Sequence, residues 1–462
     1  MCVHNHDPVE TRLDLVPKFG KRQDYARVGE SSRLVRRNMS ASLADGTGWA
    51  LMFGLGDSYF SAFALALGFP GVTSGLLGAV PQILGAIVQT AGPRMVAWLG
   101  SHKQWVVITA TVQAANLLVP VAGAIWGSMS GWLLFLTVSI HHAAGMAGGA
   151  AWSTWVGSWV PARVKHRWFG IRQRHLQAMV LTGFLLGAIV LSLVTGGVPP
   201  AEFGDNRVLL WGFAGLFAMA LAARVLSVYY LTRQAEPTPM PASQRRVPLL
   251  TIASRLMHAQ RGSVMATDGR LLVAVFGITF ASNIGQPFIV PYALDQLKIS
   301  YWWFAAVIGA AIAGRALTLS LLGSFAKSRG SHVLLLIGAV MLVPGLGVMT
   351  LFNHPAWITA IQLQSGVAWA CIELATFLMF LEHLRDDERT SWISFYYLGN
   401  TIALVLGSML GGLLIARLGS DQHAYEVVFW IATGLRALAL ILVVRVLTAI
   451  NAPEPAQAAS QP

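Results

Sequence analysis

The stretch LGSHKQWVVI at residues 99–108 returns in altered form as RGSHVLLLIG at residues 329–338, about half a chain later. In both copies Gly-Ser-His is followed by an apolar run, so His102 and His332 mark the start of two similar hydrophobic segments. A three-residue match alone has little weight. It becomes informative if other features recur at the same offset, because a fixed offset indicates an internal repeat.

Two further matches occur at nearly that offset. Ala-Trp at 151–152 returns at 368–369, and Arg-Val-Leu-Ser at 224–227 returns as Arg-Val-Leu-Thr at 445–448. Three matches at one offset predict two halves of common ancestry. If each half has an even number of spans, both point the same way and are related by an axis along the membrane normal.

The composition predicts that these halves lie in a membrane. The 462 residues are 55% hydrophobic and only 11% charged, which is more apolar surface than a soluble core of this size buries. Apolar stretches of about 20 residues are long enough to cross a bilayer as helices. A transmembrane barrel would show short alternating strands instead. We therefore expect an all-α membrane protein with twelve transmembrane helices.

The apolar runs divide the chain into a basic tail (1–41), a first six-helix bundle (42–232), a linker (233–269), a second bundle (270–448) and a C-terminal tail (449–462). In the first bundle the expected spans are 42–67, 72–91, 105–126, 131–159, 175–196 and 208–232. In the second they are 270–294, 299–324, 332–352, 355–381, 391–416 and 424–448.

Basic residues predict the orientation. Most of the 32 Lys and Arg residues fall in the N-terminal tail, the linker and the loops on the same side, whereas the opposite side carries only Arg207, Lys298 and Arg417. This bias predicts a protein of the plasma membrane with both termini in the cytoplasm. The net charge of +12 then reflects contact with anionic lipids at the cytoplasmic face, not nucleic-acid binding. Residues 247–261 fit a helix on that surface or a disordered linker.

No pattern typical of an enzyme or metalloprotein is present. Cys2 and Cys371 cannot form a disulfide framework or a cysteine metal site. The sequence has no glycine-rich phosphate loop, zinc helix or nucleophile motif. We expect no enzymatic activity, no cofactor and no metal. An intramembrane enzyme remains a weak alternative.

Six plus six helices with a basic central loop resemble the major facilitator superfamily of secondary transporters. The superfamily's signature, Gly-x-x-x-Asp-Arg-x-Gly-Arg, lies in the loops after the second and eighth spans. In the second half Gly323 and Gly330 match its two glycines, and Lys327 stands where the Asp belongs. The resemblance covers most of residues 42–448 and implies alternating access to a central cavity.

The first half matches the signature less well. Gly100 fits the later glycine, but Pro93 stands at the first and Ala97 replaces the Asp. The loss of both acids puts the family's charge-relay gate in doubt and argues against a typical drug/proton antiporter. Together with PRMVAWLGSHKQWVV and WVPARVKHRWFGIRQR, the pattern is similar to a bacterial branch of the superfamily, and this resemblance supplies no substrate.

Ionisable residues inside the spans are candidates for ion coupling because each is costly in hydrocarbon. Asp57 lies deep in the first span, and in the superfamily this span lines the cavity. We interpret it as a proton or cation site, with a structural hydrogen bond as the alternative. His141 and His142 lie near the middle of the fourth span, and one of them could exchange a proton with Asp57.

In the second half, Glu373 and Arg315 fall at similar depth and predict a buried ion pair. It is either structural or opens when a proton or substrate binds Glu373. Arg436 has no obvious partner, and Arg224 and Arg445 are expected to reach the inner surface as anchors.

The seventh span contains Gly285, Pro287 and Pro291, which predict an interrupted helix. Asn283 and Gln286 beside the break are the best candidates for substrate contacts, with hydrogen bonds between helices as the alternative. Weaker candidates are Gln82, Tyr396, Tyr397 and Asn400. The expected interfacial belt contains Trp152, Trp155 and Trp159.

The sequence therefore predicts a secondary active transporter of a small solute, with coupling to a proton or cation gradient as a further hypothesis. A protein that keeps the fold but serves as a membrane assembly factor or sensor is the alternative.

Overall fold

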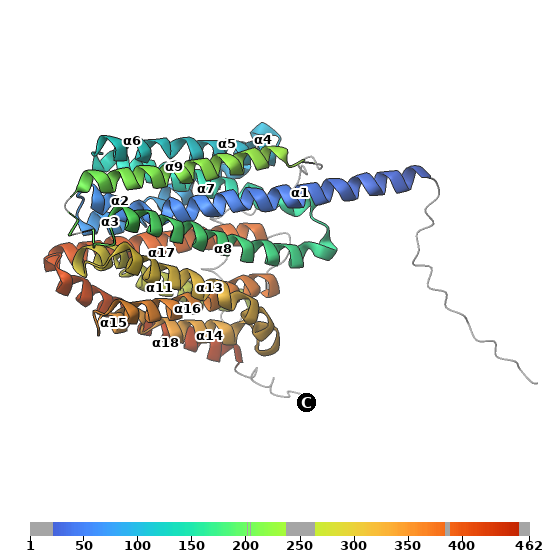
Figure 1. Ribbon diagram of the computed structural model, residues 1–462. Coiled ribbons are helices and arrows are strands. Elements are labelled where there is room, and N and C mark those ends of the chain that lie inside the picture. The colour runs from blue at the N-terminus through green and yellow to red at the C-terminus, as the bar shows by residue number, and fades with distance from the viewer. Residues whose placement is uncertain (1–21, 201, 204, 237–263, 384–388, 452–462) are drawn as a thin grey trace, which may run out of the picture.

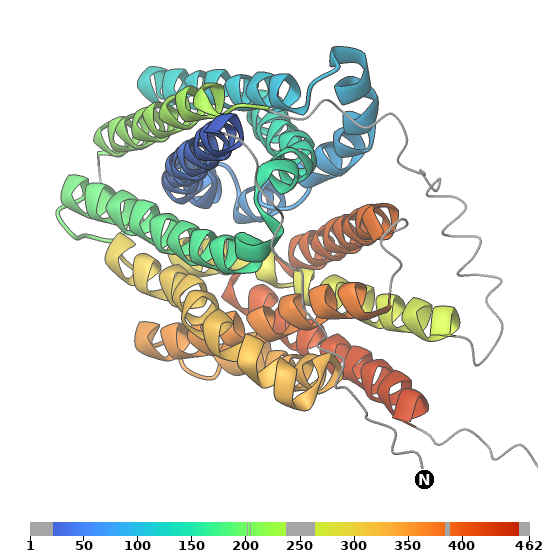
Figure 2. The ribbon, with the colours of Figure 1, turned by 90° about the vertical axis from the view of Figure 1, so that its right-hand side faces the viewer.

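The computed structural model describes residues 22–200, 202–203, 205–236, 264–383 and 389–451. These residues form helices that run roughly parallel to one another, and they contain no β-strand. The first half of the chain forms one bundle and the second half forms another beside it (Figure 1). Figure 2 shows the two bundles end-on, facing each other across their long sides.

The first bundle contains six membrane-crossing units, of which the first three each combine two helices and the last three are single helices. Its elements are α1 (Arg22–Leu55), η1 (Asp57–Tyr59), α2 (Phe60–Ala66), α3 (Gly71–Leu77), α4 (Gln82–Leu99), α5 (His102–Asn116), α6 (Leu118–Trp126), α7 (Gly131–Trp159), α8 (Ala162–Val194) and α9 (Asn206–Arg233).

The second bundle repeats this plan. Its elements are α11 (Val264–Asn283), the 3-10 turn η2 (Gln286–Phe288), α12 (Ile289–Pro291), the π-helix η3 (Tyr292–Gln296), α13 (Tyr301–Arg329), α14 (Ser331–Leu342), α15 (Gly345–Met349), α16 (Pro355–His383), α17 (Arg389–Leu418) and α18 (Gln422–Asn451). Ten helical segments among the described residues are long and apolar enough to cross a membrane. The α1–α2 unit and α13 complete the twelve.

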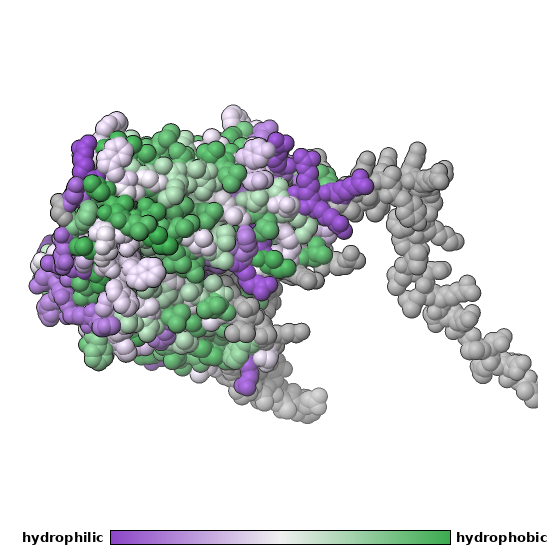
Figure 3. Space-filling view, viewed as in Figure 1, coloured by the Kyte–Doolittle hydropathy of each residue, from purple (hydrophilic) through white to green (hydrophobic). Residues whose placement is uncertain are grey.

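On the face shown in Figure 3, an apolar band lies between two hydrophilic ends. Lipid tails offer no hydrogen-bond partners. A membrane-spanning segment therefore needs apolar side chains and a backbone that satisfies its own hydrogen bonds, as a helix does. The chain is a multi-pass membrane protein. We call the end where α9 and α13 finish, at Arg233 and Arg329, the basic end, and the end where α2 and α6 finish the opposite end.

The twelve-helix prediction is confirmed, but several helices extend beyond the predicted spans. The first begins at Arg22 instead of residue 42, and the fifth at Ala162 instead of 175. Apolar runs mark only the part of a helix that faces lipid, whereas the hydrogen-bond ladder continues into polar sequence. The helix considered for 247–261 lies outside the described residues.

Both bundles begin with a broken helix. In the first bundle the break is η1 after Gly56, and in the second it is η2 after Gly285. The second break was predicted, because Pro287 and Pro291 cannot donate backbone hydrogen bonds. The first break has no proline and was not predicted. Asp57 and Gln286 occupy the same place in the two breaks, as the first residue of each 3-10 turn.

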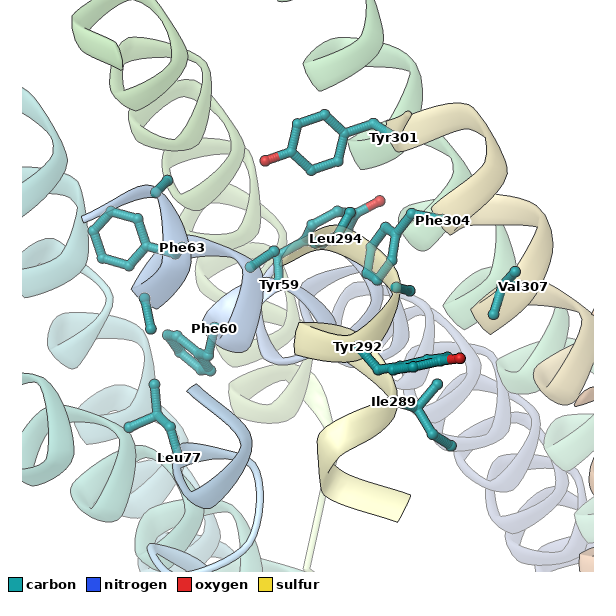
Figure 4. Packing of buried hydrophobic residues seen from close by; sticks show 14 of the residues in the cluster. Tyr59, Phe60, Phe63, Leu77, Ile289, Tyr292, Leu294, Tyr301, Phe304 and Val307 are labelled. Carbon is teal, nitrogen blue, oxygen red and sulfur yellow. The ribbon is translucent and has the colours of Figure 1, made fainter. Parts of the chain in front are cut away.

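The two bundles meet at the opposite end through an aromatic cluster, which we call the aromatic seal: Tyr59, Phe184, Phe213, Tyr301 and Phe304. The rings of Tyr59 and Phe304 lie 5.9 Å apart, and those of Phe184 and Phe304 lie 5.6 Å apart. Figure 4 shows Tyr59 of the first bundle beside Leu294 and Phe304 of the second. These side chains are essentially fully buried and close this end.

Glycines set the closest helix contacts within each bundle. A Cβ on Gly366 of α16 would collide with the carbonyl oxygen of Ala311 on α13, and a Cβ on Gly314 of α13 would collide with that of Leu363. Only glycine permits the two backbones to approach so closely. The position of Arg315, the next residue after Gly314, is therefore fixed by this contact.

Candidate functional site

A cavity of about 1050 Å³ lies between the two bundles and is lined by both. Its wall in the first bundle includes Asp45, Trp49, Phe53, Trp152, Arg172 and Arg224. Its wall in the second bundle includes Gln286, Ile312, Arg315, Gln362, Ser365 and Tyr397. The volume slightly exceeds the usual range of about 300–1,000 Å³ for small-molecule sites. Of the predicted candidates, Gln286, Arg315 and Tyr397 line it.

The cavity extends from the helix breaks toward the basic end. Phe53, one turn before Asp57, and Gln286 mark one limit, while Leu231 near the end of α9 marks the other. Beyond the breaks lies the aromatic seal. This arrangement of a central cavity with a closed opposite end is what an alternating-access protein shows in one of its two states.

Asp57 and His141 form a hydrogen-bonded pair beyond the Phe53 limit of this cavity, and neither residue is part of its lining. His141 Nε2 lies 2.8 Å from Asp57 Oδ1, and the side chains are 0% and 7% exposed. Gln113 Nε2 of α5 lies 3.2 Å from the same His141 nitrogen and donates to the His141 carbonyl. Phe60 packs edge-on against the imidazole. The predicted neighbourhood of Asp57 and a fourth-span histidine is therefore present.

The two histidines differ in their surroundings. His141 is fully buried with Asp57, whereas His142 is only half-buried and its ring centre lies 6.2 Å from that of His141. Among the described residues, no hydrogen-bond partner is found for His141 Nδ1. A carboxylate held against an imidazole can store one proton, because either group can carry it. The pair thus has the chemistry that proton coupling requires.

Sequence reasoning missed a second polar cluster, on the cavity wall nearer the basic end. Arg172 Nη2 lies 3.7 Å from Asp45 Oδ2, and Ser227 Oγ donates to Asp45 Oδ1 at 2.9 Å. Arg224 Nη1 donates to Ser227 Oγ, also at 2.9 Å. All four side chains are less than a tenth exposed. Trp152 lies under the Arg172 guanidinium at 4.2 Å.

The expectation that Arg224 is a surface anchor is wrong. Its side chain is 6% exposed and points into the bundle, because α9 continues past it to Arg233 and positions 224 and 227 lie on one helix face that meets α1. The interfacial belt is also wrong in part, since Trp155 and Trp159 are 1% and 6% exposed. The one feature of the sequence that could have indicated the missed cluster is Asp45, an acid one turn inside the predicted first span.

The predicted Arg315–Glu373 ion pair is present, with Arg315 Nη2 3.4 Å from Glu373 Oε1. It is not buried, however: the side chains are 35% and 48% exposed. Both residues belong to the second bundle, on α13 and α16, so the pair does not join the bundles. Its exposure allows either partner to be released without a large desolvation cost.

Other predicted substrate contacts instead bond within their own helix or to a neighbouring helix. Asn283 is 8% exposed and donates to the Thr279 carbonyl, while Thr279 Oγ1 donates to Asn400 at 2.7 Å. Tyr396 stacks on Phe276 of α11. Gln82 donates to the carbonyl oxygen of residue 78 within its own segment. These contacts favour the structural interpretation, leaving Gln286 as the polar cavity residue at the second break.

Arg436, which was expected to lack a partner, has two. Its Nε donates to Ser282 Oγ at 3.0 Å and its Nη1 to the Leu342 carbonyl at 2.9 Å. Ser282 immediately precedes the break in the seventh span, and Leu342 ends α14. Arg436 therefore connects the interrupted helix to a helix end whose carbonyl would otherwise be unsatisfied.

The signature glycines lie at the basic end. Gly100 ends α4 with a φ of +67° and Gly330 precedes α14 with a φ of +88°, conformations that favour glycine. Gly323 lies inside α13 and not in the loop. An acid from another segment occupies the first-half loop: Glu236 accepts hydrogen bonds from Ser101 and the His102 backbone N–H. It caps α5 in place of the missing aspartate.

Within the described residues, no group of three or more His, Cys, Asp or Glu side chains is placed to hold a metal. The charged side chains of the cavity wall are Arg172 and Arg224 with Asp45 beside them, and Arg315; the Asp57–His141 pair lies next to this wall. Such groups can bind charge and exchange a proton.

Comparison with known proteins gives structural neighbours only. No family model matches the sequence, and no curated protein matches it. Among solved structures, a mutant of the nucleoside transporter NupG matches with a TM-score of 0.64 at 13% identity, over 88% of this chain and 99% of the other. PepTSo2 matches with a TM-score of 0.68 at 12% identity, over 90% and 98%.

A mutant of the fucose:proton symporter FucP of E. coli matches with a TM-score of 0.58 at 14% identity, over 88% of this chain and 98% of the other. A second FucP structure is described as a major facilitator superfamily transporter in the outward conformation. At such identities the likeness concerns the fold. The chain has the two-bundle, twelve-helix fold of the major facilitator superfamily.

Proposed function

We propose that this protein is a secondary active transporter that carries a small solute across the membrane by alternating access. The observation that supports this most directly is a cavity of about 1050 Å³ between two bundles that are closed against each other at one end. The structural neighbours bear the names of nucleoside and fucose transporters, which agrees with this function. Rocking the bundles about the cavity would expose it to the two sides in turn.

We further propose that transport is coupled to protons through Asp57 and His141. The pair joins Asp57 of the broken first helix to His141 of α7 just beyond the Phe53 limit of the cavity, where rocking of the bundles would alter its geometry. An ionisable pair inside a membrane is energetically costly, so the pairs that occur there usually serve a function. The second bundle has the uncharged Gln286 at the matching position, so the titratable role belongs to the first bundle alone.

The distribution of basic residues supports a plasma-membrane orientation with both termini in the cytoplasm and anionic lipids at the basic end. In that orientation the cavity extends toward the cytoplasm and the aromatic seal faces outward. The Arg315–Glu373 pair is proposed as a bridge that opens when substrate or a proton reaches it.

The test uses purified protein in vesicles with an imposed pH gradient and an extract of cell metabolites outside. Mass spectrometry then identifies compounds that accumulate inside. We expect at least one compound to accumulate with the wild type but not with Asp57→Asn. The matched control is Asp205→Asn: Asp205 is exposed and caps α9, and Asn caps a helix equally well.

Equal accumulation by Asp57→Asn and the wild type would refute proton coupling through Asp57. If no compound accumulates with any variant, and the protein instead co-purifies with one stoichiometric partner, the assembly-factor or sensor alternative would replace transport.

A further inference from the structure

The charges around the cavity do not balance in every protonation state. In the first bundle, Arg172 and Arg224 contribute two positive charges, and Asp45 lies between them. The only other acid close enough to interact with Arg224 among the described residues is Asp57. With both acids ionised and the histidines neutral, the sum is zero. On the facing wall, the Arg315–Glu373 pair also sums to zero.

One proton on the Asp57–His141 pair changes this sum to +1. The groups around the pair cannot absorb that charge: α7 contributes His142, α9 contributes Arg224, and α5 and α2 contribute only the uncharged Gln113 and Phe60. Further along α1 and α8, the Asp45–Arg172 pair is already matched. An uncompensated charge in a low-dielectric interior is unfavourable, so the protonated state favours binding of an anion.

Arg224 offers the free donor that such an anion would need. It lines the cavity and is 6% exposed, and the one hydrogen bond found for it among the described residues runs to Ser227. Its Nε has no hydrogen-bond partner among those residues but is sealed from the cavity, so an anion would meet the guanidinium at its terminal nitrogens. A buried guanidinium with an unused donor is unfavourable on its own and suits a carboxylate or phosphate oxygen.

The rest of the wall indicates an organic anion. Trp49, Phe53 and Ile312 present apolar surface, while Gln362 and Ser365 present amide and hydroxyl groups. A volume of about 1050 Å³ is far larger than an inorganic ion needs.

Resting on the function proposed above, we propose that the solute is an organic monoanion held at Arg224 and Arg172 and carried together with one proton on the Asp57–His141 pair. Proton and anion then bind cooperatively, because each neutralises the charge that the other introduces. One anion and one proton cross the membrane together, so each transport step moves no net charge.

The test measures the charge preference of the cavity and needs no knowledge of the solute. Cys2→Ser and Cys371→Ala remove the native thiols, and Ser365→Cys places a single thiol on the cavity wall. Two methanethiosulfonate reagents of similar size are compared, the negatively charged ethylsulfonate and the positively charged ethyltrimethylammonium. The readout is the labelling rate of the anionic reagent divided by that of the cationic reagent. This ratio is divided by the same ratio for the unfolded protein.

We expect the anionic reagent to react faster, and the ratio to fall about tenfold in Arg224→Gln while Arg224→Lys, which keeps the charge, retains it. The ratio of the anionic to the cationic rate should rise in the wild type when the pH is lowered enough to protonate the pair, and it should change less in Asp57→Asn. Faster labelling by the cationic reagent, an unchanged ratio in a folded Arg224→Gln protein, or no labelling of a thiol that reacts after unfolding would each overturn the proposal.

This experiment separates the inference from the proposed function. A cavity that prefers anions in a protein that moves nothing would uphold the anion site and refute transport. Accumulation of a neutral or cationic compound, together with a cavity that does not prefer anions, would uphold transport and refute the anion site.

Discussion

The buried cluster around Asp45 allows a quantitative prediction for Asp45→Asn. Asparagine keeps an oxygen that can accept the Ser227 hydroxyl but removes the charge opposite Arg172. At the observed 3.7 Å and an effective dielectric constant of about 20, that charge pair is worth about 4 kcal/mol. Losing one partner of a buried pair typically costs about 3–5 kcal/mol. We expect Asp45→Asn to lower the free energy of unfolding by about 3 kcal/mol.

The assay is unfolding in mixed detergent micelles, followed by tryptophan fluorescence, with a double-mutant cycle as the control. Arg172→Gln alone should destabilise similarly, because it leaves Asp45 buried with less compensation. The double variant should recover to within about 1 kcal/mol of the wild type, since it restores the balance of charge. A loss below about 1 kcal/mol for Asp45→Asn, or simple additivity in the double variant, would refute this reasoning.

Four further changes test other parts of the structure. His141→Gln should abolish pH-gradient-driven uptake while leaving the unfolding midpoint within a few degrees, as measured by flux and thermal denaturation. Gly366→Val should prevent stable folding because its side chain would meet a backbone carbonyl of α13, whereas Gly434→Ala, which faces open space, should be tolerated; detergent gel filtration distinguishes them. Glu236→Gln should cost about 1 kcal/mol by weakening the cap on α5. Arg436→Met should lower the midpoint by several degrees, and an unchanged midpoint would contradict its connecting role.

The number of helices could be predicted from sequence because each span needs a long apolar run, and the break after Gly285 could be predicted from its prolines. The break at Asp57 could not, because no local residue forces it. The pairing of Asp57 with a fourth-span histidine was foreseeable because both lie deep in hydrocarbon, where ionisable groups seek partners.

The cluster at Asp45 and Arg224 escaped prediction for the opposite reason. Both residues lie within a few turns of the predicted span ends, where a charged side chain usually reaches water. Whether it does so depends on which helix face meets a neighbour. Here Ser227 joins the two residues inside the bundle, which no pattern within α1 or α9 alone reveals.

The aromatic seal implies an energetic asymmetry between the two faces of the membrane. Separating Tyr59 from Phe304 would wet ring surface that is now dry, and wetting about 100 Å² costs about 2.5 kcal/mol. Without compensation, that cost favours the present conformation of the empty protein over the other by a population ratio of between ten and a hundred. Under the alternating access proposed above, the unloaded protein would have to separate these rings in each cycle, and replacing one of them with alanine should shift the resting population toward the other state.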